Sequence, residues 1–209
     1  MTTWDKIYKN YQKGGPAYAS LSFKIYPLFK KYIKRSKFTS KSALDIGCGD
    51  GRYLKYLQRF GFKTDGIDSS ATSVKMTKKL LKDKSRIVLA DMFKYKIPPD
   101  KYDFIFSINT IQHGKKTQVK KLIERIGKAL PRKGKIFITL PDYSQVSKWN
   151  SFKKKKAIQP GTYLPLVGPE KGLPHSFFTK KEVHALFAKF HHLKMRLGEW
   201  GRWYIQAEK

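Results

Sequence analysis

Cysteine is almost absent from this sequence, and long apolar runs are absent altogether. The single cysteine, Cys48, excludes an internal disulfide and any zinc site built from several cysteines. No stretch approaches the ~20 consecutive apolar residues of a membrane span. The N-terminal residues MTTWDKIYKN also lack the apolar region of a secretory signal peptide. We therefore expect a soluble, cytoplasmic protein that does not associate with membranes.

Acidic residues are scarce as well. The 15 Asp and Glu stand against 45 Lys and Arg, which gives a formal net charge of +30. One interpretation is a polyanionic partner such as tRNA, rRNA or DNA, held by counterion release. The other is a general lysine bias, because only 8 of the cations are arginine, whose forked side chain is favoured in phosphate recognition. The densest run, Lys153 to Lys156, is expected to be a solvated loop.

The chain is long enough for one domain, which we expect to span residues 1–209 and to bury roughly 70% of its unfolded surface. Apolar periodicity predicts strands that alternate with helices and a closing pair of strands. The predicted strands are 43–46, 62–67, 86–90, 102–108, 135–140, 193–197 and 202–207, and the helices include 71–81 and 116–129. This order predicts an α/β fold, a three-layer αβα sandwich around a seven-stranded, mostly parallel, Rossmann-like sheet with an antiparallel last strand.

Three glycines at alternate positions mark the most informative stretch. Gly47, Gly49 and Gly51 follow the predicted strand 43–46, and a helical pattern begins after them. Glycine suits this turn because the backbone must adopt unusual dihedrals and because a ligand can approach a main chain without side chains. The amino end of the helix also directs amide groups and partial positive charge at the turn. The spacing differs from the dinucleotide fingerprint G-x-G-x-x-G, so a nicotinamide site fits poorly.

The stretch is similar to a different known motif. Asp45 and the three glycines match, position by position, the D-x-G-x-G-x-G of motif I in class I S-adenosylmethionine (SAM)-dependent methyltransferases. The chain resembles the small-molecule, type 11/12-like group of that family. A carboxylate beside the turn suits the cationic amino group and sulfonium of SAM. The resemblance implies methylation with SAM as cofactor and S-adenosylhomocysteine as product. It also places Cys48 in the cofactor loop, as a small, close-packed residue.

Asp68 is the next candidate cofactor ligand. It follows the second predicted strand, where an α/β nucleotide site places an acid for the ribose hydroxyls. Asp68 or Ser69 would also suit the cap of helix 71–81, and capping is compatible with ribose binding. The resemblance implies that Asp68 binds the ribose and that Ser69 lines the adenine.

The ends of the third and fourth strands supply the remaining predicted cofactor contacts. The resemblance implies that Asp91 accepts a hydrogen bond from the adenine amino group and that the backbone of Met92 meets a ring nitrogen. A strand-end carboxylate is a suitable acceptor for an exocyclic amine. By the same resemblance, the backbone near Ile108 and Asn109 accepts a hydrogen bond from the methionine amine.

Residues 1–40 are expected to form an N-terminal helical segment. Trp4, Tyr8 and Tyr11 recur at spacings of four and three, so they would share one helical face. This face either packs on the core or, as the resemblance implies, folds over the SAM pocket as a lid, with Tyr11 as a cofactor contact. A second helix is predicted over residues 20–34, around Pro27.

Proline and glycine interrupt residues 141–177, which we expect to form a long ordered loop or insertion on the substrate side. The alternative is a structural cover for the sheet edge. Its candidate acceptor ligands are Tyr143, Trp149, Tyr163, Glu170 and His175. Beyond it, Thr179 and Glu182 form a capping box that starts another helix.

Methyl transfer is an in-line displacement that mainly requires aligned atoms and excluded water. Where the acceptor must lose a proton, His113 or His175 is the candidate catalytic base. His113, in the sequence Ile111-Gln112-His113, either faces the acceptor or fixes its loop. No metal site is expected.

Motifs that the sequence lacks narrow the range of possible methyl acceptors. Asn109 is followed by Thr110 and Ile111 instead of the Pro-Pro-Tyr typical of exocyclic-amine nucleic-acid methylation, and no second cysteine could attack a pyrimidine. We therefore expect transfer of a methyl group to an O or N atom of a small molecule. The alternatives are a tRNA or other nucleic-acid methyltransferase, and a SAM- or RNA-binding protein without catalysis.

Overall fold

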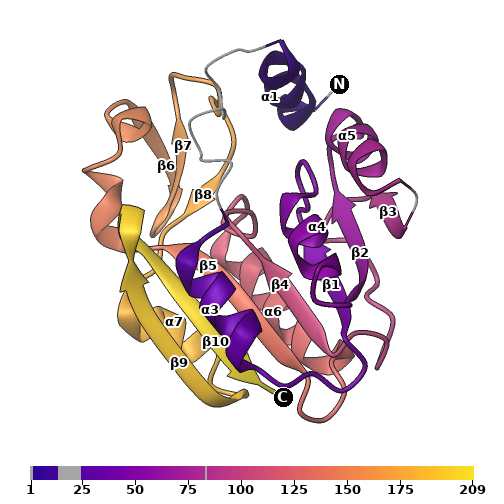
Figure 1. Cartoon of the computed structure of the whole chain (residues 1–209). Coiled ribbons are helices and arrows are strands. Elements are labelled where there is room, and N and C mark those ends of the chain that lie inside the picture. The colour runs from indigo at the N-terminus through magenta and orange to yellow at the C-terminus, as the bar shows by residue number, and fades with distance from the viewer. Residues whose placement is uncertain (1, 14–24, 83) are drawn as a thin grey trace.

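The computed structural model describes residues 2–13, 25–82 and 84–209 (Figure 1). The described residues contain a seven-stranded sheet with the strand order β3-β2-β1-β4-β5-β10-β9. Its strands are β1 (Ser42–Ile46), β2 (Lys63–Asp68), β3 (Ser85–Leu89), β4 (Phe104–Ser107), β5 (Lys135–Pro141), β9 (His191–Gly198) and β10 (Arg202–Glu208). β1 to β5 pair in parallel, whereas β10 is antiparallel to both β5 and β9. The predicted fold class is confirmed.

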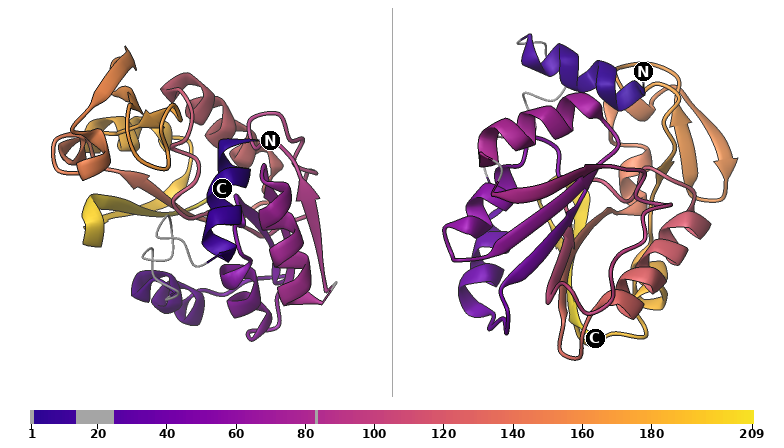
Figure 2. Two further views of the ribbon diagram at one scale, coloured as in Figure 1. Left: turned by 90° about the horizontal axis from the view of Figure 1, so that it is seen from above. Right: turned by 90° about the vertical axis from the view of Figure 1, so that its right-hand side faces the viewer.

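Helices cover both faces of the sheet and give three layers (Figures 1 and 2). One face carries α3 (Pro27–Arg35), α4 (Arg52–Gln58) and α5 (Ala71–Leu81). The other carries α6 (Lys116–Ala129) and α7 (Lys180–Leu186), whose start is the predicted capping box of Thr179 and Glu182. The bounds of α5 and α6 agree with the predicted helices 71–81 and 116–129.

Successive strand residues alternate between two cores. Phe104, Phe106 and Phe137 pack with Phe29 of α3 in an aromatic core. Ile105, between the two phenylalanines of β4, faces the aliphatic core beneath α6 and α7. A slip of one residue would send each side chain to the opposite core, so the burial pattern fixes the register of these strands.

The segment after β5 is more regular than the sequence predicts. Its strands form a separate three-stranded antiparallel sheet: β6 (Lys155–Gln159), β7 (Thr162–Pro165) and β8 (His175–Ser176). Short 3-10 helices precede it and also join β9 to β10: η1 (Tyr143–Val146), η2 (Asn150–Phe152) and η3 (Glu199–Gly201). The solvated-loop prediction for the lysine run is wrong in its second half, because Lys155 and Lys156 begin β6.

The N-terminal helix α1 (Thr3–Gln12) lies beyond the carboxyl ends of the parallel strands, beside α5 (Figures 1 and 2). The predicted helix over 20–34 lies partly outside the described residues. Its described part begins at Pro27, because proline suits the first turn of a helix and is unfavourable further inside.

Candidate functional site

A cavity of about 490 Å³, here called the central cavity, is lined by residues at the carboxyl ends of β1, β2, β3 and β4 and by residues of α1. This is the position that an open α/β sheet gives to a ligand. Eleven of the predicted cofactor and catalytic residues line it: Asp45, Gly47, Cys48, Gly49, Asp68, Ser69, Asp91, Met92, Ile108, Asn109 and His113. The strand ends therefore bring together residues that are far apart in sequence.

The glycine turn presents bare backbone to the cavity. The amides of Gly47 and Cys48 both donate to the carbonyl of Ile67, at 2.8 and 2.9 Å, and tie the turn to the end of β2. Gly47 has φ of +81°, and a Cβ there would lie 2.1 Å from Thr110 Cγ2. Gly49 has φ of +57°, and its Cβ would lie 2.7 Å from the hydroxyl oxygen of Tyr8. Both conformation and close approach therefore require glycine.

Asp45 provides a test of whether the cavity suits a cationic ligand. Its side chain is 3% exposed, and its Oδ1 has no hydrogen-bond partner among the described residues. Burial raises the pKa of Asp45 well above its ordinary value, and Asp68 and Asp50 raise it further. A buried carboxylate without a partner is unfavourable. A bound ammonium or sulfonium would stabilise its charged form, so the residues present fit SAM.

Asp68 holds the glycine turn in place. Its two oxygens accept from the amides of Gly49 and Ser70, each at 2.9 Å. Burial raises the pKa of Asp68, and these two hydrogen bonds oppose that rise. The cap of α5 is Ser70, whose hydroxyl accepts from Ser73 N at 3.2 Å, so the suggestion that Asp68 or Ser69 is the cap residue is corrected.

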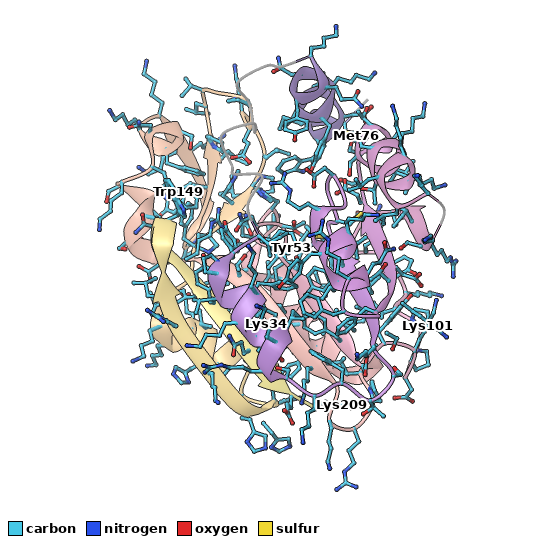
Figure 3. All side chains as sticks on the ribbon, viewed as in Figure 1. Lys34, Tyr53, Met76, Lys101, Trp149 and Lys209 are labelled. Carbon is cyan, nitrogen blue, oxygen red and sulfur yellow. The ribbon has the colours of Figure 1, made fainter. Side chains whose placement is uncertain are left out.

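The opposite wall is formed by the residues that follow β4. Asn109 has φ of +56°, and its amide donates to Thr139 Oγ1 at 2.8 Å. Its side-chain amide donates to the hydroxyl of Tyr26 at 2.7 Å, which joins this wall to the residue before α3. Tyr26 and Tyr53 both line the cavity, and Figure 3 shows Tyr53 near the centre of the molecule. The two hydrogen bonds of Asn109 thus join three segments of the chain and fix this wall.

α1 forms the roof of the cavity. Asp5 Oδ1 accepts from Ser70 Oγ at 2.8 Å and from Thr72 N at 2.9 Å, which docks α1 on the amino end of α5. These two hydrogen bonds, that from Thr72 first, lower the pKa of Asp5. Trp4 and Tyr8 line the cavity from above, so α1 occupies the position of a lid. Burial raises the pKa of Tyr8, with smaller contributions from Asp68 and Asp50.

Two predicted cofactor residues lie elsewhere. Tyr11 does not line the cavity and instead packs edge-on against Tyr8, with ring centroids 6.5 Å apart. The two residues share one helical face, and the docking angle of α1 selects Tyr8. Gly51 is the N-cap of α4, with φ of +81°, and also lies outside the lining.

The five predicted acceptor ligands are also outside the lining: Tyr143, Trp149, Tyr163, Glu170 and His175. Tyr143 and Tyr163 meet through their hydroxyls at 3.1 Å, and Trp149 packs on the guanidinium of Arg202, 4.8 Å from the ring centroid. The Trp149 ring also packs against Phe152 and Phe177, at 6.1 and 5.4 Å between ring centroids. Of residues 141–177, Leu173 and Pro174 line the cavity instead.

His113 reaches the cavity between Trp4 and His175, with ring centroids at 4.7 and 4.4 Å. Burial, with a smaller contribution from His175, lowers the pKa of His113 to about 3, so the ring is neutral at physiological pH. Gln112 Nε2 donates to Asn109 O at 2.8 Å and lies 3.1 Å from His113 Nε2. His113 Nδ1 has no partner among the described residues.

Buried His175 pairs with half-buried Glu170 behind His113. His175 Nε2 lies 3.0 Å from Glu170 Oε2, and His175 Nδ1 lies 3.0 Å from the carbonyl of Leu173. Both ring nitrogens therefore face acceptors, and both bonds are made at once only when both nitrogens carry protons. Ligand atoms of His113, Glu170 and His175 lie within 4.8 Å of one another, a cluster of metal-ligand types that the sequence did not suggest.

Several lining residues had no recognisable signal in the sequence. They are Thr2, Thr3, Arg52, Phe93, Thr110, Gln118, Leu173 and Pro174. Each reaches the cavity through the packing of its element, and none belongs to a short motif. Arg52 is the only Lys or Arg in the described lining, and its guanidinium pairs with Asp50 at 2.7 Å.

Comparison with known proteins is consistent with this geometry. A Caenorhabditis elegans protein named phosphoethanolamine N-methyltransferase 2 is 33% identical over 105 residues, covering 48% of this chain and 24% of that protein. A Bos taurus protein named probable tRNA methyltransferase 9B is 24% identical over 184 residues, covering 81% of this chain and 39% of that protein. The matched region is thus less than half of either relative.

Solved structures share the fold. A Pyrococcus horikoshii protein superposes with a TM-score of 0.77 at 17% identity and covers 100% of this chain and 99% of that one. Haemonchus contortus phosphoethanolamine N-methyltransferase 2, solved in complex with SAM, superposes with a TM-score of 0.61 at 22% identity. That match covers 81% of this chain and 37% of the other.

None of the described helices has both the length and the apolar character to cross a membrane.

The model of the methyltransferase domain family matches residues 21–191. With motif I lining a cavity at the carboxyl ends of a seven-stranded sheet, the chain belongs to this family and has the fold and cofactor-loop motif of a class I SAM-dependent methyltransferase domain.

Proposed function

We propose that the enzyme methylates an N or O atom of a small acceptor that is neutral or cationic. The observation that carries this proposal is the charge of the central cavity. Four carboxylates line it, from Asp45, Asp50, Asp68 and Asp91, against one guanidinium, from Arg52. A cavity with acidic walls inside a chain of net charge +30 favours cationic ligands and repels phosphate groups.

The methyl donor is assigned to the wall formed by β1, β2 and β3. Asp45 suits the cationic end of SAM, Asp68 the ribose hydroxyls, and Asp91 with Met92 the adenine edge. When bound, SAM supplies an electrophilic methyl carbon on a sulfonium. The glycine turn and Asp68 hold this half of the cavity rigid, and α1 excludes water from above.

The acceptor is assigned to the remaining half, between α1 and the residues after β4. Its walls are mostly apolar or aromatic: Trp4, Phe93, Leu173 and Pro174. His113 and Gln118 provide the polar groups there. A neutral His113 can orient an acceptor hydroxyl or amine and hold its proton at a ring nitrogen. The low pKa of about 3 makes His113 a weak base, so its main role is alignment of the acceptor.

The phosphoethanolamine methyltransferases among the relatives support an amine acceptor in general. Phosphoethanolamine itself carries a phosphate, for which no described lining residue offers a free cation. We therefore propose an acceptor without phosphate. A cytoplasmic location remains part of the proposal.

The test is transfer of an isotopically labelled methyl group from SAM. The enzyme would be incubated with three fractions of a cell extract: the small molecules that pass an ultrafiltration membrane, and the RNA and the protein separated from the retained material. We expect the label in the small-molecule fraction, in a compound that a cation-exchange resin retains or that neither a cation-exchange nor an anion-exchange resin retains. His113→Gln should lower turnover and leave SAM affinity unchanged. Label that appears only in RNA, or in a phosphorylated amine, would overturn the proposal.

A tRNA acceptor is the second candidate, favoured by the net charge and by similarity to the bovine protein over 81% of the chain. Methylation of RNA would decline steeply between about 50 and 200 mM salt, because phosphate contacts release counterions. Methylation of a small acceptor would change little. A binding protein without catalysis would give no S-adenosylhomocysteine with any acceptor fraction.

A further inference from the structure

A second cavity, of about 590 Å³, lies between α3 and the part of the sheet formed by β9 and β10. We call it the α3 groove. Its lining is strongly basic, with one carboxylate, Glu208, against six Lys and Arg side chains: Lys31, Arg35, Lys37, Lys135, Lys194 and Arg196. Methyl transfer in the central cavity gives this groove no role.

The sequence places these cations in two rows. Lys31 and Arg35 are one turn apart on α3, so they share a face, and neither α3 nor β9 contains an acidic residue. On the sheet, Lys194 lies opposite Gln206 and Arg196 opposite Tyr204. Strand alternation puts these residues on the face that α3 covers.

Little of this charge is neutralised within the protein. Glu208 pairs with Lys135. The other five cations of the groove form no ion pair with a carboxylate in the part of the chain that the structure describes. Lys31, Arg35, Lys194 and Arg196 are all exposed. Like charges that line a concave surface strengthen one another's field and attract an anion of several charges.

We infer that the α3 groove binds the phosphate backbone of single-stranded RNA. Neighbouring cations in each row are about 6 Å apart, from the rise of one helical turn or of two strand residues. Two such rows along a groove suit a chain of regularly spaced phosphates. A flat bilayer surface would not reach the floor of the groove, and a single small anion would contact only part of either row.

The groove floor indicates that binding is independent of base sequence. Tyr204 is 4% exposed, and the half-buried ring of Tyr32 packs against Phe38, Phe104 and Phe137. Both rings are engaged by neighbouring aromatic side chains, so the contacts that we infer are to the RNA backbone. The ring contact of Tyr204 with Tyr26, at 5.4 Å, separates the groove from the central cavity. The RNA would anchor the enzyme and would not be its acceptor.

The test compares two variants that each lose four positive charges. The groove variant is Lys31→Gln, Arg35→Gln, Lys194→Gln and Arg196→Gln. The control variant is Lys75→Gln, Lys78→Gln, Lys79→Gln and Lys120→Gln, at exposed positions of α5 and α6. Binding of a fluorescent oligouridine of about 16 nucleotides is measured by anisotropy between about 50 and 200 mM salt.

We expect the groove variant to bind at least about tenfold more weakly and to lower the salt-dependence slope by about 3, since each phosphate contact contributes about 0.7. The control should bind like the wild type. Equal losses in both variants would show a diffuse charge effect and overturn the proposal, as would binding of phosphatidylserine vesicles without binding of RNA. Unchanged SAM affinity and thermal unfolding would show that both variants fold.

Discussion

The roof that α1 forms over the glycine turn can be tested with one added methyl group. Gly49→Ala would place Cβ 2.7 Å from the Tyr8 hydroxyl oxygen, while the next nearest atom, Tyr8 Cζ, is 3.8 Å away. The steric conflict therefore involves a single atom, which Tyr8→Phe removes. The left-handed backbone at Gly49, with φ of +57°, adds roughly 1–2 kcal/mol for any residue with a Cβ.

We expect Gly49→Ala alone to destabilise the protein and weaken SAM binding by more than the backbone cost. In the double variant with Tyr8→Phe, the steric part should be recovered, which gives a coupling free energy of about 1 kcal/mol or more. Urea unfolding and SAM titration of the four proteins measure it. Gly61→Ala is the matched control, because Gly61 also has positive φ, of +79°, but its Cβ would meet no atom closer than 3.9 Å.

Additive effects of Gly49→Ala and Tyr8→Phe would refute this account of the roof, because they would mean that Tyr8 does not lie over the turn. Coupling between Gly61→Ala and Tyr8→Phe would be equally damaging, since it would reveal a general effect on stability.

Three further predictions concern titratable groups of the site. Asp5→Ala removes both hydrogen bonds that dock α1 on α5, so stopped-flow measurements should show faster SAM dissociation with little change in thermal unfolding. The pKa of His113 is about 3 in the folded protein against about 6.5 when unfolded, so only the unfolded chain gains this proton between those pH values. As the pH falls through that window, His113 therefore lowers the free energy of unfolding by about 1.4 kcal/mol per pH unit. In urea titrations at neutral and at mildly acidic pH, the free energy of unfolding of His113→Gln should fall less than that of the wild type. Burial raises the pKa of Asp45 and a cationic ligand would lower it, so SAM affinity should rise with pH through the raised pKa. Calorimetry in two buffers should then detect proton release that Asp45→Asn abolishes.

The predictable part of the molecule is the part specified by local pattern. β1, β2 and β3 are parallel neighbours, so the sheet brings Asp45, Asp68 and Asp91, at or just after their carboxyl ends, to one edge. Motif I and these strand ends therefore indicate, from the sequence alone, the edge of the sheet at which the central cavity lies. The charge contrast between its acidic lining and the basic chain was not predictable, because it depends on which side chains share a cavity.

The errors fall where tertiary contacts select among equivalent residues. Tyr8 and Tyr11 share a face of α1, and only the docking of Asp5 on α5 decides that Tyr8 meets the turn. His175 was expected at the acceptor, but its hydrogen bonds to Leu173 and Glu170 hold it behind His113.

The small sheet was missed for a related reason. Its strands contain two to five residues, interrupted by proline and glycine and preceded by a lysine run. Such strands show no alternation of apolar and polar residues that the sequence could reveal. They are held by contacts across the chain, such as the 2.6 Å hydrogen bond between the hydroxyls of Thr162 and Ser176.

The most direct test of the central claim is calorimetric titration of the wild type and of Asp45→Asn with SAM, S-adenosylhomocysteine and NADH. We predict micromolar binding of the first two ligands by the wild type, no binding of NADH, and SAM binding weakened by about 10- to 100-fold in Asp45→Asn, as for the loss of a charged hydrogen-bond partner. Binding of NADH alone, or equal SAM affinity in both proteins, would contradict the assignment of SAM to the central cavity beside Asp45.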